Sequence, residues 1–257
     1  MKPLNTSRWT IALLLAASLP AVAGKAGFSK DDKKDNKAKP ASQVVDSGTF
    51  GVFKKGQRVI TETFKVEQEN GASVIKSQLK LTAADDPTSQ NSDLEITPSG
   101  DLVRYTWSQN TGGSLSVMPN NDFLMEKITA PGTTKAAEQS FLMPTSTAVL
   151  DNNFFVQREV FAWRYLAADC KTEGGAFKCQ QGPAEFGVLV PQDRNSLRVR
   201  LEMIGSEKVT IRGTQRDLLR LNLTGEDFQW SLWLDTQDHY KLIRVTIPAD
   251  DMEVVRD

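Results

Sequence analysis

The amino-acid sequence predicts a mainly β protein, with a strongly curved antiparallel sheet or incomplete barrel of about ten strands around one central helix at about 150–168. Three observations support this fold class. Apolar and polar residues alternate with a period of two through most of the chain after residue 47. Residues typical of tight turns separate the alternating segments. One segment, residues 150–168, contains neither Gly nor Pro and has an apolar pattern of helical period.

The first 23 residues have the three parts of a secretory signal peptide. Lys2 and Arg8 give a basic start, residues 9–19 form an uncharged core, and small residues precede Gly24. The core is shorter than the roughly 20 apolar residues that a membrane-spanning helix needs. No later segment is long and apolar enough either, so we expect no transmembrane span after cleavage. Cleavage near Ala23 and Gly24 predicts a protein of the periplasm or a secreted protein.

Composition divides the rest of the chain into a tether and a domain. Residues 24–46 consist largely of Lys, Asp, Ala, Ser and Asn, with Phe28, Val44 and Val45 as the bulky apolar side chains. Such a segment cannot bury enough apolar surface to fold, which predicts a disordered tether at 24–46 and a single β-rich domain at 47–257. Removal of the signal peptide changes the formal net charge from −1 to −3. Because this charge is small, we expect no nucleic-acid partner.

The first strands of the domain form a predicted hairpin. Residues 59–66 and 75–81 alternate between apolar and polar side chains, and Asn70 with Gly71 supplies the two positive-φ residues of a tight turn. Further alternating segments lie at 103–107, 197–203, 219–223, 228–234 and 243–247. Strands with one apolar and one polar face form an antiparallel meander. A sheet of this size must curl or close to protect its edges.

The helix predicted at 150–168 is apolar on nearly all sides, which is typical of a buried helix. A buried helix inside a curved sheet leaves two interpretations of its aromatic side chains open. They either fill the core or line a cavity for an apolar ligand, because packing gaps at such a helix can form a pocket. The candidate cavity residues are Phe154, Val160, Phe161, Trp163 and Tyr165.

The two cysteines, Cys170 and Cys179, flank a Gly-Gly turn. In an oxidising compartment this spacing predicts a local disulfide that closes a hairpin-like loop. The alternatives are a zinc site and a redox site. A structural zinc would lack ligands because the chain has one histidine, and the C-x-x-C spacing of thioredoxin-like sites is absent. We therefore expect no metal site and no cofactor.

No catalytic residue can be assigned from the sequence. The single histidine, His239, lies in a predicted turn, and neither a Gly-x-Ser-x-Gly elbow nor a His-Glu-x-x-His helix accompanies it. The carboxylate pairs at 85–86 and 250–251 are adjacent in loops, where successive side chains diverge. Glycosidases instead need two carboxylates that face each other across a cleft. We therefore expect a protein that is not an enzyme.

Arginines concentrate on two predicted strands near the C-terminus. If these strands are neighbours, several guanidinium groups would converge on one face, a geometry suited to carboxylate or phosphate. Neighbouring acidic residues leave the alternative of a mixed, solvated face open. The four candidate anion-binding residues are Arg198, Arg200, Arg216 and Arg220.

Four short segments carry a family resemblance: GTFGV at 48–52, DNN at 151–153, WLD at 233–235 and LIRV at 242–245. With them the chain resembles a group of secreted bacterial proteins of unknown function, similar in outline to the LolA/LolB lipoprotein carriers. The resemblance implies an incomplete antiparallel barrel capped by helices around an apolar cavity. The chain departs from that pattern in having one clear mid-chain helix, and from LolB in lacking the lipidated Cys. The resemblance transfers no catalytic or binding residue.

Three functions remain open at this point. The first is a non-enzymatic periplasmic or envelope protein that binds an apolar ligand such as a lipid, an acyl chain or a lipoprotein. The second is a structural or protein-interaction module in envelope assembly, with an envelope protein as partner. The third is a hydrolase, which would need a polar cleft with convergent acidic side chains.

Overall fold

The computed structural model of the chain describes residues 42–82, 88–174 and 176–257. The predicted signal peptide at 1–23 lies outside these residues, as does the predicted tether up to residue 41. Residues 43–46 of the predicted tether belong to the first strand. Val44 pairs there with Glu67, and the buried carboxylate of Asp46 binds Arg256, so these residues have the partners that the composition of the segment did not reveal.

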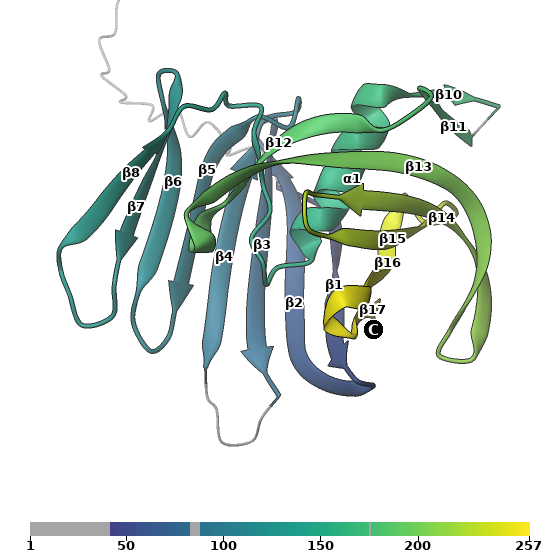
Figure 1. Ribbon diagram of the computed structural model, residues 1–257, viewed down its shortest axis with the longest axis horizontal. Helices are drawn as coiled ribbons and strands as arrows, with labels where there is room; N and C mark the ends of the chain where they lie inside the picture. Colours follow the sequence, from purple (N-terminus) through teal and green to yellow (C-terminus); the bar gives the residue numbers. More distant parts are fainter. Residues whose placement is uncertain (1–41, 83–87, 175) are drawn as a thin grey trace, which may run out of the picture. The chain divides into compact units, whose positions relative to one another are not determined.

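Fifteen strands of the described chain form one open sheet (Figure 1). The N-terminal half of the sheet runs outward from β1 (Gln43–Lys54) through β2 (Gln57–Glu69), β3 (Ala72–Leu81), β4 (Ser89–Ile96), β5 (Leu102–Gln109), β6 (Ser114–Asn120) and β7 (Phe123–Thr129) to the edge strand β8 (Ala136–Phe141). The C-terminal half runs from β17 (Met252–Arg256) through β16 (Lys241–Ile247), β15 (Gln229–Asp235), β14 (Thr214–Thr224), β13 (Asn195–Ile211) and β12 (Ala184–Val190) to the other edge, β9 (Ala148–Val149).

The two halves join where β1 pairs with β17, with Phe50 opposite Arg256. All neighbouring strands are antiparallel except β9 and β12, which are parallel. The prediction of a mainly β, antiparallel fold is confirmed, and the Asn70–Gly71 turn has the expected positive φ angles of 53° and 82°. The prediction of about ten strands is wrong. Strands β6 to β8 were missed because they are short and have few buried apolar residues, which gives a weak alternating pattern.

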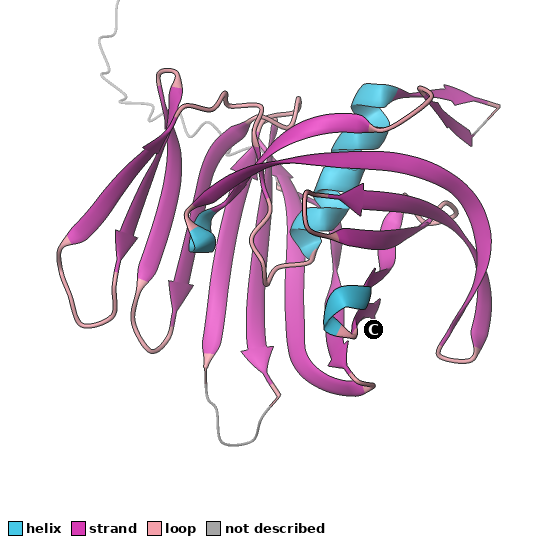
Figure 2. Cartoon of the chain, in the orientation of Figure 1, coloured by secondary structure: helices cyan, strands magenta, loops and turns pink. Residues whose placement is uncertain are grey.

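A single α-helix of the described residues, α1 (Val156–Asp169), lies between the two halves of the sheet (Figures 1 and 2). It contacts β3 in the N-terminal half and β16 in the C-terminal half. The helix begins at Val156 rather than near residue 150. The preceding segment forms a turn instead, in which the Asp151 carboxylate accepts the N–H of Asn153 at 3.1 Å. Such a local side-chain bond competes with helix formation.

The main core fills the space between α1 and the inner face of the sheet. Its fully buried side chains come from both halves of the sheet and from the helix, and include Phe50, Tyr105, Leu124, Tyr165, Leu201 and Leu232. A second, small core lies on the opposite face of the neighbouring strands β13, β14, β15 and β16. It consists of Val209, Leu218, Trp233 and Ile243.

After α1 the chain forms a separate two-stranded hairpin of β10 (Cys170–Glu173) and β11 (Ala176–Cys179). Short 3-10 turns at Pro191–Asp193 and Pro248–Asp250 connect strands of the main sheet. Within residues 42–82, 88–174 and 176–257, none of the helices combines the length and the apolar character that a bilayer crossing requires.

Candidate functional site

The five aromatic and aliphatic residues predicted to line a cavity divide into two groups. Phe154, Phe161 and Tyr165 are core residues with exposed fractions of 0%, 3% and 1%. The ring of Phe161 packs edge-on against Phe186 of β12 at a centroid distance of 5.0 Å. Val160 and Trp163 also contact the core, and both line a cleft at the surface. The space beneath the helix is therefore largely filled, and the cleft is the part of the predicted cavity that is open.

Buried polar contacts fix the N-terminus of α1. Glu62 of β2 is fully buried and accepts the backbone N–H groups of Phe155 at 2.7 Å and of Val156 at 3.3 Å. It also accepts the hydroxyl of Ser77 at 2.7 Å. The Glu62 carboxylate thereby accepts from N–H groups that a helix N-terminus otherwise leaves free. Burial is nevertheless the larger effect and raises the pKa of Glu62 to about 7.

A second set of contacts holds the segment before the helix. The guanidinium of Arg158 is buried and donates to the carbonyl oxygens of Asp151 and Phe154. The hydroxyl of Tyr105 on β5 donates to the Asp151 carboxylate, whose pKa is raised by burial. Burial also lowers the pKa of Arg158 to about 10. These groups are enclosed by the core and therefore hold the helix in place rather than face a ligand.

A third set joins α1 to the two central strands. The buried carboxylate of Glu159 accepts the backbone N–H of Leu242 at 3.2 Å and the guanidinium of Arg256 at 3.2 Å. Arg256 also donates to both carboxylate oxygens of Asp46 at 2.7 Å. Burial raises the pKa of Glu159 well above its usual range, and the charge of Arg256 opposes this shift. The first turn of α1 is thereby tied to β1 and β17.

The cleft lies between the C-terminal half of α1 and the turn that joins β4 to β5, and its volume is about 430 Å³. Its apolar walls are Ile96, Pro98, Val160, Trp163, Ala167 and Ala168. The turn is well ordered because the N–H of Gly100 donates to the carbonyl of Thr97 and the hydroxyl of Ser99 donates to the Asp101 carboxylate, both at 2.9 Å. The cleft is therefore preformed, as small-molecule sites usually are.

Two side chains of α1 are positioned at the cleft by bonds to neighbouring loops. The indole N–H of Trp163 donates to the carbonyl of Tyr240 at 2.8 Å, and the guanidinium of Arg164 donates to the carbonyl of Gly100 at 3.2 Å. The guanidinium also lies 5.9 Å from the ring centroid of Phe186. Arg164 is half-buried, and within the described part of the chain no carboxylate lies within 4.0 Å of it. Desolvation lowers the pKa of Arg164.

The cleft adjoins a small cavity of about 20 Å³, which shares Ile96, Gly100, Val160 and Arg164 with the cleft. Thr147 and Gln157 line this cavity, and the hydroxyl of Thr147 has no hydrogen-bond partner among the described residues, whereas the side-chain amide of Gln157 interacts with the hydroxyl of Tyr105. Buried polar groups are normally paired. The cavity is large enough for about one water molecule.

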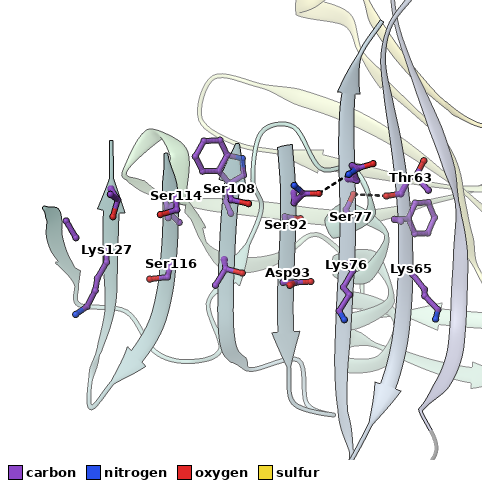
Figure 3. A pocket seen from close by; sticks show the side chains of 18 of the residues that line it. Thr63, Lys65, Lys76, Ser77, Ser92, Asp93, Ser108, Ser114, Ser116 and Lys127 are labelled. Atoms are coloured by element: carbon purple, nitrogen blue, oxygen red, sulfur yellow. Dashed lines mark hydrogen bonds between the residues drawn. The ribbon is translucent and has the colours of Figure 1, made fainter. Parts of the chain in front are cut away.

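A larger hollow of about 960 Å³ lies on the outer face of the N-terminal half of the sheet (Figure 3). Lys65, Lys76, Asp93, Ser116 and Lys127 project from its strands. Two of these lysines are already paired, because Lys65 lies 2.7 Å from Glu67 and Lys127 lies 2.8 Å from Glu138. Their side chains are about half exposed, so this face has the mixed charge of a solvated sheet surface.

The structure distributes the four candidate arginines along the two long strands β13 and β14. Arg200 is opposite Thr224, whereas Arg216 is opposite Val209, which lies about 30 Å further along β13. Three of the four have acidic partners: Arg200 with Glu185 at 2.8 Å, Arg216 with Asp235 at 3.8 Å, and Arg220 with Glu207 at 3.6 Å. Arg198 is exposed on β13. The four guanidinium groups do not share one site.

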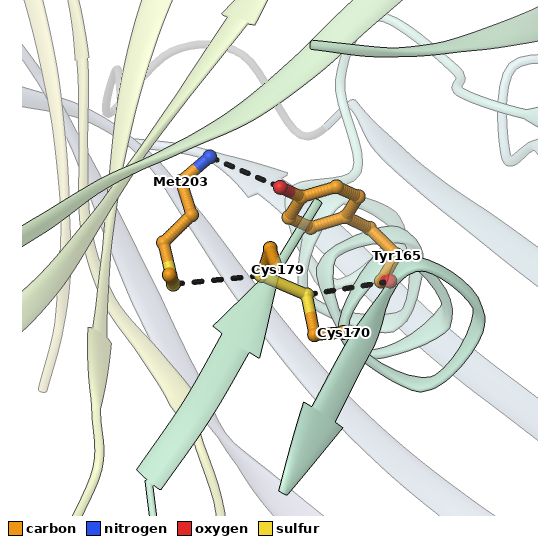
Figure 4. The surroundings of a disulfide bond; sticks show 4 residues. All are labelled: Tyr165, Cys170, Cys179 and Met203. Atoms are coloured by element: carbon orange, nitrogen blue, oxygen red, sulfur yellow. Dashed lines mark hydrogen bonds between the residues drawn. A yellow bond between two sulfur atoms is a disulfide. The ribbon is translucent and has the colours of Figure 1, made fainter. Parts of the chain in front are cut away.

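The predicted disulfide between Cys170 and Cys179 is confirmed (Figure 4). It joins the two opposing end residues of the β10–β11 hairpin. The hairpin lies at the C-terminus of α1, where the Tyr165 hydroxyl accepts the backbone N–H of Met203 at 3.1 Å.

The single histidine, His239, is exposed in a turn, where its Nδ1 lies 3.2 Å from Oδ1 of Asp238. Among the described residues, no cluster of three His, Cys, Asp or Glu side chains could hold a metal ion.

The sequence did not single out Arg164, Thr147 or Gln157 as site residues. Arg164 and Gln157 were visible as polar positions on an otherwise apolar helix, which is the one signal that could have marked them. Thr147 had no signal, because its position depends on the strand order of β9 and β12.

Comparison of the chain with family models, with curated proteins and with solved structures gives no match. The resemblance to the LolA/LolB carriers therefore stays a prediction.

Proposed function

We propose that this chain is a non-enzymatic periplasmic protein that binds an apolar ligand, and that the apolar part of the ligand occupies the cleft beside α1. The observation that supports this function best is a preformed concave surface with apolar walls from the helix and from the β4–β5 turn. Val160 and Trp163, which the sequence marks as ligand candidates, lie in these walls. The lipid, acyl chain or lipoprotein expected from the sequence would place one apolar segment in this cleft.

The periplasmic location belongs to the same proposal. The Cys170–Cys179 disulfide supports it, because disulfides persist in oxidising compartments. The predicted signal peptide with its cleavage near Ala23 and Gly24 supports it from the sequence.

Saturable binding of the neutral fluorophore N-phenylnaphthylamine to the mature protein tests the proposal, because its emission rises in an apolar site. Ala167 is exposed on the cleft wall, so Ala167→Trp fills the cleft without cutting into the core. We expect this variant to weaken binding by about tenfold or more, which corresponds to about 1.4 kcal/mol. The matched control, Ala130→Trp, changes an exposed alanine outside the cleft and should bind as the unchanged protein does.

Lipid extraction and mass spectrometry of protein purified from its native envelope complete the test. A co-purifying lipid that Ala167→Trp loses and Ala130→Trp keeps would support the cleft. If the fluorophore does not saturate and no lipid co-purifies, or if both variants bind as the unchanged protein does, the proposal fails.

The alternative, a protein-interaction module of the envelope, has one observation in its favour. Leu142, Met118 and Phe123 have exposed fractions of 76%, 51% and 42%. Leu142 directly follows the edge strand β8, and the other two lie on β6 and β7, the next strands of the sheet. Unpaired sheet edges can recruit another chain. Crosslinking from position 142 in intact cells would capture an envelope protein if this function holds, and it would yield the uncrosslinked monomer if it does not.

A further inference from the structure

The cleft contains a cation that makes no direct ion pair among the described residues, although the charge of Asp101 acts on it from beyond 4.0 Å. Arg164 contributes up to five N–H donors, and one of its nitrogens donates to the carbonyl of Gly100. The remaining donors face a partly desolvated site in which no described carboxylate lies within 4.0 Å. Two more deeply buried arginines have several partners each, because Arg256 binds acidic side chains and Arg158 donates to two backbone carbonyls. Arg164 donates to one carbonyl, so its guanidinium retains donors for an anion supplied by another molecule.

The other polar groups beneath the cleft match this chemistry. The side-chain nitrogen of Gln157 can only donate hydrogen bonds, and the hydroxyl of Thr147 can donate one. Both residues line the small cavity together with Arg164, and the Thr147 hydroxyl has no partner among the described residues. The polar side of the site therefore offers donors, and the matching group on a ligand is an acceptor.

The position of Arg164 is set by the glycine on the opposite wall. Gly100 has a φ of 82°, and a Cβ there would lie 2.8 Å from Cδ of Arg164. A side chain at this position would displace the guanidinium from the cleft. The backbone of the β4–β5 turn thus permits the close approach that brings Arg164 between the cleft and the cavity.

From this arrangement we infer that the cleft selects an anionic amphiphile, with its carboxylate bound by Arg164 and its apolar chain against Ile96, Val160 and Trp163. This inference rests on the proposed function, since it names the class of apolar ligand that the same cleft takes. A guanidinium binds a carboxylate through two parallel N–H bonds, which a hydroxyl or an ester cannot reproduce.

Competition of decanoate and of decanol against N-phenylnaphthylamine tests the selection, because the two ligands share one chain and differ in the head group. We expect decanoate to bind about tenfold more tightly than decanol at neutral pH. Arg164→Gln should remove this preference by weakening decanoate binding. Arg164→Lys keeps the positive charge but lacks the planar guanidinium that binds a carboxylate through two parallel bonds, so it should retain part of the preference.

The matched control is Arg198→Gln, which removes an exposed arginine outside the cleft and should keep the full preference. Equal binding of decanoate and decanol, or an unchanged preference in Arg164→Gln, overturns the inference and leaves the proposed function standing. If neither ligand displaces the fluorophore and the fluorophore itself does not saturate, both the inference and the proposed function fail. Circular dichroism of each variant establishes that it is folded.

Discussion

The carboxylate of Glu62 accepts the backbone N–H of Phe155 at 2.7 Å, across a sequence separation of 93 residues. A strand of the N-terminal half of the sheet thereby caps the helix that separates the two halves. Since Glu62 is fully buried, the strength of this contact depends on which protonation state the interior favours. This dependence links the helix position to pH.

Raised carboxyl pKa values predict that the domain loses stability as pH rises from about 4.5 to about 7. The pKa of Glu62 is about 7 in the folded state against 4.5 in the unfolded state, because burial disfavours the charge. The folded state therefore binds more protons in this window, and the free energy of unfolding falls with increasing pH. For one such group the fall is at most about 3 kcal/mol. Urea unfolding at pH 5 and pH 7.5 measures it.

The Glu62→Gln variant provides the control for this prediction. Its amide oxygen can still accept the Phe155 N–H, but it does not titrate, so the fall should become smaller. Glu126, which is also buried with a pKa of about 7, keeps part of the pH dependence in that variant. Equal stability at both pH values in the unchanged protein would contradict the assignment.

Two buried serines on neighbouring strands predict opposite effects of the same substitution. Ser77 and Ser92 are directly opposite each other, with exposed fractions of 5% and 4%. The hydroxyl of Ser77 donates to Glu62 at 2.7 Å, whereas the hydroxyl of Ser92 has no partner within the described part of the chain. We expect Ser77→Ala to lower the free energy of unfolding by about 1–3 kcal/mol and Ser92→Ala to leave it unchanged or higher. Denaturant titration measures the free energy of unfolding of both variants, and an equal loss in the two would contradict this prediction.

The central position of Arg256 predicts a large loss when its charge is removed. Its guanidinium binds Asp46 and Glu159 and lies 5.1 Å from the ring centroid of Phe64. Arg256→Met leaves buried Glu159 without an ion pair and Asp46 with Lys241 at 3.5 Å as its cation, and should cost about 3–5 kcal/mol of unfolding free energy. Arg200, whose ion pair with Glu185 is exposed, is the matched control, and Arg200→Met should cost less than about 1 kcal/mol. Similar losses in thermal or urea unfolding would show that the central network is unimportant.

The disulfide should stabilise one hairpin and leave the sheet intact. Cys170 and Cys179 belong to β10 and β11, which form a sheet of their own. Closing so short a loop contributes about 2.5–3 kcal/mol in the chain-entropy model. In the Cys170→Ser, Cys179→Ser variant, hydrogen exchange should therefore accelerate in residues 170–179 and stay unchanged in β1 and β17. Loss of protection in those central strands would contradict this local role.

Local patterns in the sequence were sufficient for the class of fold and for single elements. The Asn70–Gly71 turn, the disulfide and a buried mid-chain helix follow from turn chemistry, spacing and apolar period, and all three are present. The pairing of β1 with β17 is different, because its partners lie at opposite ends of the described chain and no local pattern connects Phe50 with Arg256.

The candidate site was predictable only in part for the same reason. Val160 and Trp163 could be named because an aromatic helix in a β-rich chain is conspicuous. Arg164 becomes a candidate only when it is known which acidic groups surround it, and that depends on the turn from β4 to β5 and on β12. The four arginines near the C-terminus show the opposite case, in which a local pattern suggested a site that does not form. Their alternation on the strands does not bring them to one place, because Arg200 and Arg216 lie far apart in the pairing of β13 with β14.

Two glycines with similar backbone angles predict different effects of Gly→Ala. Gly56 and Gly100 have φ angles of 76° and 82°, so alanine is strained at both positions, by about 1 kcal/mol or more. A Cβ at position 56 meets nothing within 4 Å, whereas at position 100 it meets Arg164 at 2.8 Å. Both variants should therefore lose stability in urea unfolding, but only Gly100→Ala should also lose the preference for decanoate over decanol. In that variant Arg164 no longer reaches the position from which it binds the carboxylate. If folded Gly100→Ala keeps the preference unaltered, the position of Arg164 is not set by this turn.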